Sequence, residues 1–377
     1  MTGSLTIDEF VANFGEEPGY LDFARQAPIG ETAVAEQLAM IELLSRGRFG
    51  SLDLFEEQDK RVREAVAALS GFRADHVVFQ PNTSSGLMHA MFGLTGTLAV
   101  SPAEFPALTV AAVRASEALR AMKINWIETD DGRVTPGNLK KQLTKATTAV
   151  AVSLVDFRTG YLVDLEGIRQ VIGDRLLIVD AIQGFGCVDA PFDLADVVVG
   201  GGQKWVRAGW GTGFLAMSDR AIERLTPVFS GFSATTATGM PLDEVPPPAA
   251  GVRAYSVSNP DPIAQARFAA ALEEIAEVGV PAIRDRIIGA TGRIIDLADE
   301  FGIPVISSRN LNERAGIVVL HPAEDQLTVL AASLHNHGVT ATRRGGTVRL
   351  SAHVTTTEET FDMLRASFLG FATAITV

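Results

Sequence analysis

Cysteine, long apolar runs and basic charge are all scarce in this sequence. Cys187 is its single cysteine, so no internal disulfide can form, and no set of metal ligands clusters around it in the sequence. Every apolar stretch is interrupted by Asp, Gly, His or Pro before it reaches the roughly 18 residues that a membrane-spanning helix needs. The N-terminal segment MTGSLTIDEF has no basic region followed by an apolar one, so we expect no secretory signal and a cytoplasmic location.

The shortage of basic residues also limits the classes of partner. The chain has 45 acidic and 32 basic residues, which gives a formal net charge of −13. A field of that sign repels nucleic acid and anionic lipid surfaces, so small molecules or proteins are the expected partners. Hydrophobic residues make up 47% of the 377 residues and charged residues only 20%, a composition that predicts a folded globular protein.

Short apolar runs alternate with amphipathic stretches between residues 75 and 218. The predicted strands are 76–80, 98–101, 149–155, 176–180 and 197–200, and the predicted helices are 83–94, 106–122 and 164–172. Repeated strand and helix units of this kind predict an α/β fold with a mainly parallel sheet that helices cover on both faces. The run at 211–217 has no crossover helix before it, which predicts an antiparallel strand in the same sheet.

A segment rich in Thr, Pro and Gly at residues 235–251 is typical of a linker. It is followed by two predicted helices at 261–276 and 281–300, by short strands and by a last helix at 357–372. Short strands flanked by helices predict a smaller α+β domain. We therefore expect a large domain over residues 1–250 and a small C-terminal domain over residues 251–377.

Two charged residues follow neighbouring predicted strands. The apolar run RLLIVD ends in Asp180, and DVVVGGGQK ends in Lys204. Ligands of open α/β sheets bind at the carboxyl ends of the strands, and one strand-to-strand step spans the 24 residues between the two side chains. An amine and an acid placed side by side match the needs of pyridoxal phosphate, which requires a Schiff base and a partner for its ring nitrogen. A structural salt bridge is the alternative explanation.

A third segment helps to decide between a cofactor site and a structural salt bridge. Pro81-Asn82-Thr83-Ser84-Ser85-Gly86 follows the strand HVVFQ and opens a predicted helix. Amides, hydroxyls and the positive end of the helix form a natural cradle for a phosphate group. A plain Ser/Thr helix cap explains the same residues, so this segment carries weight only together with Asp180 and Lys204.

Taken in order, these motifs resemble class V aminotransferase-type pyridoxal phosphate enzymes. The shared order is a Thr/Ser-rich helix start, Glu followed by an aromatic residue, Ser-x-Val-x-x-x-Thr-Gly, Asp-x-x-Gln, Lys, and Arg-x-Ser-x-His. This group includes cysteine desulfurases, kynureninases and isopenicillin epimerase-like proteins. The resemblance extends from Tyr20 to the last helix, and it implies fold type I, with a mainly parallel seven-stranded sheet in the large domain.

The resemblance also implies roles for individual residues. It makes Lys204 the Schiff-base lysine and Asp180 the partner of the pyridinium nitrogen. Gln183 is similar to the glutamine that hydrogen-bonds the cofactor's phenolic oxygen, and Phe105 stands where a ring stacks on the pyridine. Thr83, Ser84 and Gln203 match positions around the phosphate. Core packing is the alternative explanation for Phe105.

Further matches concern the substrate and a second subunit. Arg349 is similar to the family arginine that grips the substrate carboxylate, a task that suits its planar, two-pronged guanidinium; a solvated strand residue is the alternative. Ser258 and Asn259 resemble the segment that relatives contribute to the neighbouring phosphate across a dimer interface. The resemblance therefore implies a homodimer with shared sites. We expect no metal ion, because no set of ligands is visible.

The reaction stays open at this point. A class V aminotransferase acting on an amino acid is the first hypothesis, and a kynureninase-like hydrolase, a C–S or β-elimination lyase and an epimerase are the alternatives. A protein that keeps the fold but only binds is a further alternative, which the joint presence of Lys204, Asp180 and Arg349 disfavours. The region before Arg349 has no cysteine, which disfavours the chemistry of cysteine desulfurases.

Overall fold

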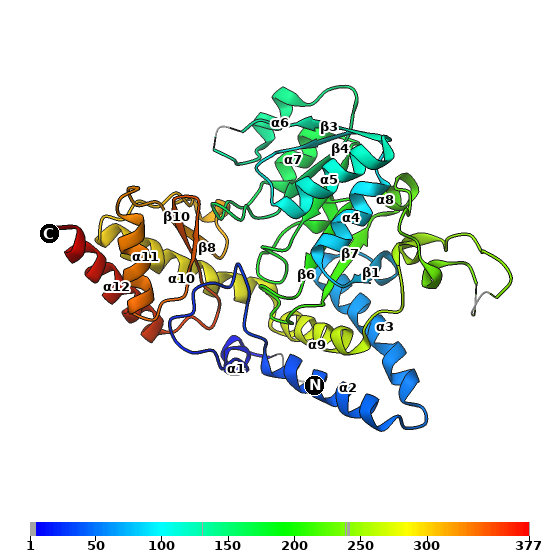
Figure 1. Ribbon diagram of the computed structural model, residues 1–377, viewed down its shortest axis with the longest axis horizontal. Coiled ribbons are helices and arrows are strands. Elements are labelled where there is room, and N and C mark those ends of the chain that lie inside the picture. Colours follow the sequence, from blue (N-terminus) through cyan, green and yellow to red (C-terminus); the bar gives the residue numbers. More distant parts are fainter. Residues whose placement is uncertain (1–4, 130, 238, 240–241, 377) are drawn as a thin grey trace.

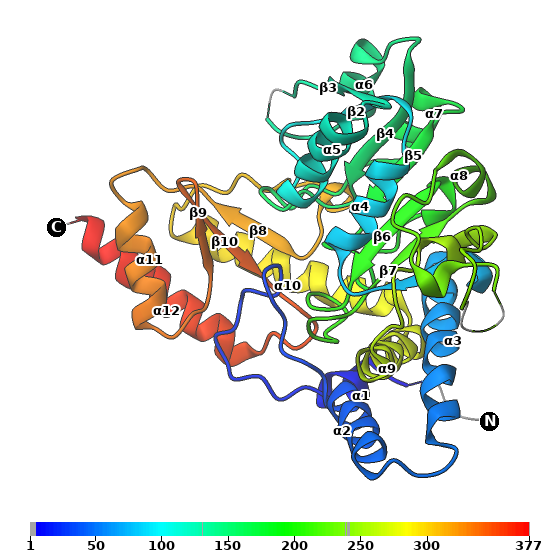
Figure 2. The ribbon, with the colours of Figure 1, turned by 45° about the vertical axis from the view of Figure 1, so that its right-hand side comes forward.

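A computed structural model describes residues 5–129, 131–237, 239 and 242–376. Its large sheet contains β1 (Val77–Gln80), β2 (Gly96–Val100), β3 (Met122–Trp126), β4 (Thr147–Ser153), β5 (Leu176–Asp180), β6 (Val197–Gly201) and β7 (Gly213–Met217). The strand order is β1-β7-β6-β5-β4-β2-β3 (Figures 1 and 2). Pairing is parallel from β6 to β3, and β7 runs antiparallel to both of its neighbours. The prediction of a mainly parallel seven-stranded sheet is confirmed.

Helices cover both faces of this sheet. They are α1 (Ile7–Ala12), α2 (Glu31–Arg46), α3 (Ser51–Ser70), α4 (Thr83–Gly93), α5 (Pro106–Leu119), α6 (Pro136–Gln142), α7 (Leu165–Ile172), α8 (Asp219–Arg224) and α9 (Pro262–Val278). Strand β5 shows how the faces are divided, since Leu176 and Ile178 pack with α4 and α5 while Leu177 and Val179 pack with α3, α7 and α9. Side chains of a strand point alternately to opposite faces, so a continuous apolar strand fills both layers of the core.

Several elements differ from the sequence prediction. The helix expected over residues 106–122 ends at Leu119, because Arg120 adopts a left-handed conformation with φ of 56°, and Met122 begins the edge strand β3. Buried and exposed residues do not alternate regularly along β3, so the sequence showed no strand pattern there. Helix α2 was not predicted, and many of its apolar side chains are exposed, including Leu38 and Leu44.

A second, smaller sheet has the order β8 (Ile317–Leu320), β10 (Thr347–Ser351), β9 (Thr342–Arg344), with antiparallel pairing. Its apolar face packs on α10 (Val280–Glu300), α11 (Leu327–Asn336) and α12 (Glu358–Thr376). The sheet and these helices lie to one side of the large sheet (Figures 1 and 2). The sequence prediction of a second α+β unit agrees with this arrangement, whereas the boundary at residue 250 stays a prediction; residues 238, 240 and 241 of the expected linker lie outside the described residues.

The N-terminal arm, residues 13–30, joins the two units. Tyr20 pairs with Thr340 and Asp22 with Ser351 through isolated bridges, and the Ala24 amide donates to the Ser351 hydroxyl at 2.9 Å. On its other side the arm meets the segment that carries Lys204, since the Ala27 amide donates to the Gln203 carbonyl at 2.9 Å. The arm therefore runs between the carboxyl edge of the large sheet and β10. Within the described residues, no helix is both long enough and apolar enough to cross a membrane.

Candidate active site

The carboxyl ends of several parallel strands gather the predicted residues at one edge of the large sheet. Asp180 is the last residue of β5, and Lys204 follows β6, the neighbouring parallel strand. Thr83 begins the helix after β1, and Phe105 precedes the helix after β2. Strand β1 runs antiparallel to β7, which runs antiparallel to β6, so β1 ends at the same edge as the others.

The Asp180 carboxylate is buried, and only one of its two oxygens has a hydrogen-bond partner in the described part of the chain. Its Oδ1 accepts a hydrogen bond from the Ile182 amide at 3.0 Å, whereas Oδ2 has no partner in the described part of the chain. Burial raises the pKa of Asp180 to about 6, and the Ile182 amide and Lys204 oppose that rise. A buried acceptor without a donor is rare in folded proteins, so Oδ2 points to a ligand that donates a hydrogen bond.

The Lys204 amine faces the same space. Its side chain is 9% exposed, and Nζ lies 5.6 Å from the centroid of the Phe105 ring. Burial lowers the pKa of Lys204 to about 8; Asp180 opposes that change, and the cations Arg349 and Arg344 reinforce it. An amine with a lowered pKa is partly neutral near physiological pH, which a nucleophile or a base requires.

Polar groups converge beside the start of α4. The Asn82 side chain caps this helix by accepting from the Ser85 amide at 2.9 Å, while the buried Thr83 hydroxyl has no partner among the described residues. A Cβ added at Gly201 would lie 2.8 Å from Thr83 Oγ1 and 2.7 Å from Gln203 Oε1. The absence of a side chain at Gly201 thus leaves a small space that a hydroxyl and an amide border. Ser84 is exposed on the first turn of the helix.

Gln183 is held from two sides. Its Nε2 donates to the Ala24 carbonyl and its Oε1 accepts from Trp205 Nε1, both at 2.9 Å. These bonds tie the segment after β5 to the N-terminal arm and to the residue that follows Lys204. The contact of Gln183 with a cofactor oxygen stays a prediction.

Arg349 reaches the site from the small sheet. It lies on β10, is buried, and donates from Nη1 to the Phe157 carbonyl at 3.2 Å. The Phe157 ring packs edge-on against Phe105, with 5.0 Å between the ring centroids. Phe157 therefore contacts Arg349 through its carbonyl and Phe105 through its ring.

Asp22 is a member of this cluster that the sequence analysis did not identify. Its Oδ1 lies 3.6 Å from Arg349 Nη2 and accepts from the Thr342 hydroxyl at 2.6 Å. Burial raises the pKa of Asp22, and the Thr342 hydroxyl and Arg349 oppose that rise. The triplet Tyr20-Leu21-Asp22 opens the stretch that resembles the family, but no spacing in the sequence connects residue 22 to residue 349.

Ser258 and Asn259 lie elsewhere. Both are exposed and line a groove of about 1920 Å³ whose border also includes Ser85. No hydrogen bond in the described part of the chain joins them to Lys204 or Asp180. The lining of the groove, among the described residues, includes Ser85 but not Thr83, Asp180 or Lys204.

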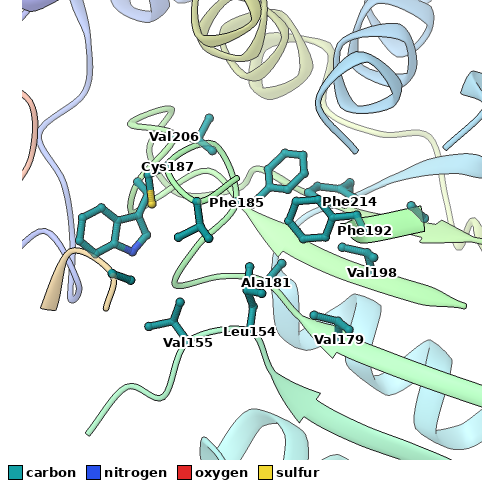
Figure 3. Close-up of a cluster of buried hydrophobic side chains, with 14 of the residues drawn as sticks. Leu154, Val155, Val179, Ala181, Phe185, Cys187, Phe192, Val198, Val206 and Phe214 are labelled. Carbon is teal, nitrogen blue, oxygen red and sulfur yellow. The ribbon is translucent and has the colours of Figure 1, made fainter. Parts of the chain in front are cut away.

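Cys187 is part of the core behind the site. It is 2% exposed, its thiol donates to the Gly184 carbonyl at 3.4 Å, and it packs in an apolar cluster with Val206 and Phe185 nearby (Figure 3). Burial raises the pKa of the thiol well above its ordinary value. A buried thiol of this kind is inert, since the thiolate is the reactive form.

Replacing Cys187 by alanine is therefore expected to leave kcat and KM within about twofold of the wild type. The loss of one buried sulfur atom costs about 1 kcal/mol of folding free energy. Steady-state kinetics and urea unfolding of the variant measure the two effects. A large drop in kcat without a loss of folding would give the thiol a catalytic part and contradict this prediction.

The residues at this edge fit pyridoxal phosphate. An amine, an acid with a free acceptor oxygen, an aromatic ring beside the amine and a hydroxyl-lined space at a helix start are the groups that hold its aldehyde, ring nitrogen, ring face and phosphate. Two of these groups, Asp180 Oδ2 and the Thr83 hydroxyl, are buried without partners in the described part of the chain.

Comparisons with known proteins agree with this fit. A probable hercynylcysteine sulfoxide lyase of Mycobacterium tuberculosis (strain CDC 1551 / Oshkosh) is 29% identical over 339 residues, which cover 83% of this chain and 80% of the relative. An apo cysteine desulfurase from Thermococcus onnurineus NA1 superposes with a TM-score of 0.81 at 21% identity, covering 92% of this chain and 93% of that one. A mutant of C-DES with glycine covalently linked to its PLP cofactor gives a TM-score of 0.84 at 16% identity, covering 93% and 96%. The family described as Aminotransferase class-V matches residues 49–377, so the chain belongs to the class V aminotransferases, a family of pyridoxal phosphate-dependent enzymes.

Proposed function

We propose that this chain binds pyridoxal phosphate at the carboxyl edge of the large sheet and breaks a bond in the side chain of an amino acid. The observation that carries the proposal is the placement of Lys204 and the unpartnered Asp180 Oδ2 on neighbouring strands. When bound, the cofactor supplies an electron sink for the bonds at Cα of the substrate. All other functions at the site belong to side chains of the protein.

Each side chain has a role that its position supports. The Asp180 carboxylate would accept a hydrogen bond from the protonated ring nitrogen and so keep that nitrogen charged. The Lys204 amine would hold the cofactor through its aldehyde and would take the proton from Cα, a task that its lowered pKa assists. Arg349 holds the α-carboxylate with two parallel hydrogen bonds and so fixes the orientation of Cα. The remaining contacts with the cofactor are assigned to Thr83, Ser84, Phe105, Gln183 and Gln203.

Elimination of a sulfur substituent is the reaction that the comparisons favour. The M. tuberculosis relative is described as a probable lyase of a cysteine-derived sulfoxide. Cys187 is buried and does not belong to a mobile loop near Arg349, so transfer of sulfur to a protein thiol, as in a desulfurase, does not fit. Transamination requires the same groups, but it would transfer the amino group to the cofactor and leave every bond of the side chain intact.

The products separate the candidate reactions. Purified protein loaded with pyridoxal phosphate is incubated with S-substituted L-cysteines, with kynurenine and with common amino acids. β-Elimination converts an S-substituted cysteine and water into a thiol, pyruvate and ammonia, and we expect these in equal amounts. An intact keto acid together with the amine form of the cofactor would establish transamination instead, alanine with a released side chain would establish hydrolysis, and a changed stereocentre would establish epimerisation.

A homodimer and a cytoplasmic location complete the proposal. The groove that Ser258 and Asn259 line is bordered by exposed apolar side chains, among them Phe232 and Val257, as expected of a surface that a second copy covers. Residues from the second copy would then approach the phosphate end of the site. Sedimentation should give about twice the chain mass of 40.1 kDa, and a monomer with full activity would contradict this part of the proposal.

A further inference from the structure

The β9–β10 hairpin presents a second arginine on the face that carries Arg349. Thr342 pairs with Arg349 across the two strands, and Arg344 pairs with Thr347. Side chains alternate between the faces of a strand, so Thr342 and Arg344 share the face of Arg349, while Arg343 pairs with Val348 and points to the other face. Thr342 contacts Asp22 and Arg349, which identifies this face as the one toward the site.

Aromatic rings connect this arginine to the catalytic lysine. Lys204 Nζ lies 5.6 Å from the Phe105 ring centroid, and the Phe105 and Phe157 centroids are 5.0 Å apart. The Arg344 guanidinium carbon lies 5.0 Å from the centroid of Phe157. These contacts link the buried Lys204 to the exposed Arg344 through the two rings.

Arg344 differs from the other two arginines that surround Phe157. Arg349 is paired with Asp22 at 3.6 Å, and Arg158 is paired with Asp156 at 3.6 Å. Arg344 makes no ion pair with any residue that the structure describes. Its charge nevertheless acts within the site, because it lowers the pKa of both Lys204 and Arg349. Packing on a ring face leaves the edge of a guanidinium free to donate two parallel hydrogen bonds.

We propose that Arg344 binds a carboxylate at the far end of the substrate's side chain, so that the enzyme prefers amino acids with a second negative group. This inference rests on the proposed function, because it takes the substrate's Cα to lie near Lys204 and its α-carboxylate on Arg349. A side chain that leaves Cα along the Phe105 and Phe157 rings ends at Arg344. Two arginines of the same hairpin, Arg349 and Arg344, then bind the two ends of the substrate.

A matched pair of substrates tests the proposal. S-carboxymethyl-L-cysteine and S-carbamoylmethyl-L-cysteine have nearly the same shape and differ in one charge. With protein that carries pyridoxal phosphate, kcat and KM are measured for both compounds, and their dissociation constants are measured from the change in cofactor absorbance. The variants are Arg344→Gln and Arg344→Lys, and Arg343→Gln is the control on the opposite face of the same strand.

We expect the wild type and Arg343→Gln to bind the carboxylate about tenfold more tightly than the amide. Arg344→Gln should lose this preference through KM and the dissociation constant, with kcat little changed, and Arg344→Lys should keep part of it. Equal binding of the two compounds by the wild type, or an unchanged preference in Arg344→Gln, would overturn the role of Arg344 while turnover leaves the proposed function intact. If neither these compounds nor any other amino acid changes the cofactor absorbance, both proposals fail.

Discussion

Lys204→Ala protein is expected to lose turnover by about 10³-fold or more, because the proposed function gives one amine the tasks of holding the cofactor and moving the proton at Cα. The loss should appear in kcat, since the role proposed for Arg349, binding of the substrate carboxylate, does not depend on Lys204. The variant should also lack the cofactor band that borohydride removes from the wild type. The free energy of unfolding of the variant should not fall, because the change removes a buried amine whose pKa is lowered to about 8 by its burial.

Lys140→Ala is the matched control, since Lys140 is an exposed lysine on α6, away from the site. It should keep wild-type turnover and the cofactor band. Added methylamine offers a second check, because a small amine can replace the missing proton carrier in the Lys204 variant and restore part of the rate. Full turnover of Lys204→Ala without added amine would refute the assignment of the site.

The sequence predicts the large sheet well because its strands are buried on both faces. Runs such as 176–180 and 197–200 are short and continuously apolar, which is typical of strands in a buried parallel sheet. The edge strand β3 and the helix α2 were missed for the opposite reason. One is half exposed, and the other keeps apolar residues on its surface, so neither shows the contrast between faces on which the prediction depends.

The candidate site also has a part that the sequence predicts and a part that it does not. Asp180 ends one apolar strand and Lys204 follows the next, and parallel strands end at a common edge, so sequence order implies that they are neighbours. Asp22 and Arg344 lie beside Arg349 and Phe157 through contacts between the arm, the small sheet and the large sheet. No local pattern encodes contacts between segments that are more than a hundred residues apart. For Asp22 the only signal was its place in the triplet that opens the resemblance.

Asp180→Asn protein is expected to show opposite changes in activity and stability. Asparagine cannot keep the ring nitrogen protonated, so turnover should fall by roughly 10²-fold or more. The cofactor-free variant should nevertheless be more stable than the cofactor-free wild type at pH 7. Burial raises the pKa of Asp180 from 3.8 to about 6, which means that the folded chain holds a charge that it disfavours.

The sign and the pH range follow from this raised pKa. Between pH 3.8 and about 6 the folded state binds the Asp180 proton more tightly than the unfolded state does, so the free energy of unfolding falls as the pH rises. Above pH 6 the buried charge lowers the free energy of unfolding of the wild type by its full amount, about 3 kcal/mol for a pKa rise of this size. In the asparagine variant, the unsatisfied side-chain amide offsets part of the stability gained by removing this charge.

Urea unfolding of the two cofactor-free proteins at pH 7 and at pH 3.5 measures this difference. The variant should be about 1–3 kcal/mol more stable at pH 7 and gain little at pH 3.5, where the wild-type carboxyl is protonated in the folded state and mostly protonated in the unfolded state. Addition of pyridoxal phosphate should reverse the order at pH 7, because only the aspartate gains a charged partner on the ring nitrogen. An asparagine variant that is less stable at pH 7 without cofactor would mean that Asp180 is a structural ion-pair residue, and the site would lose its strongest evidence for a ligand.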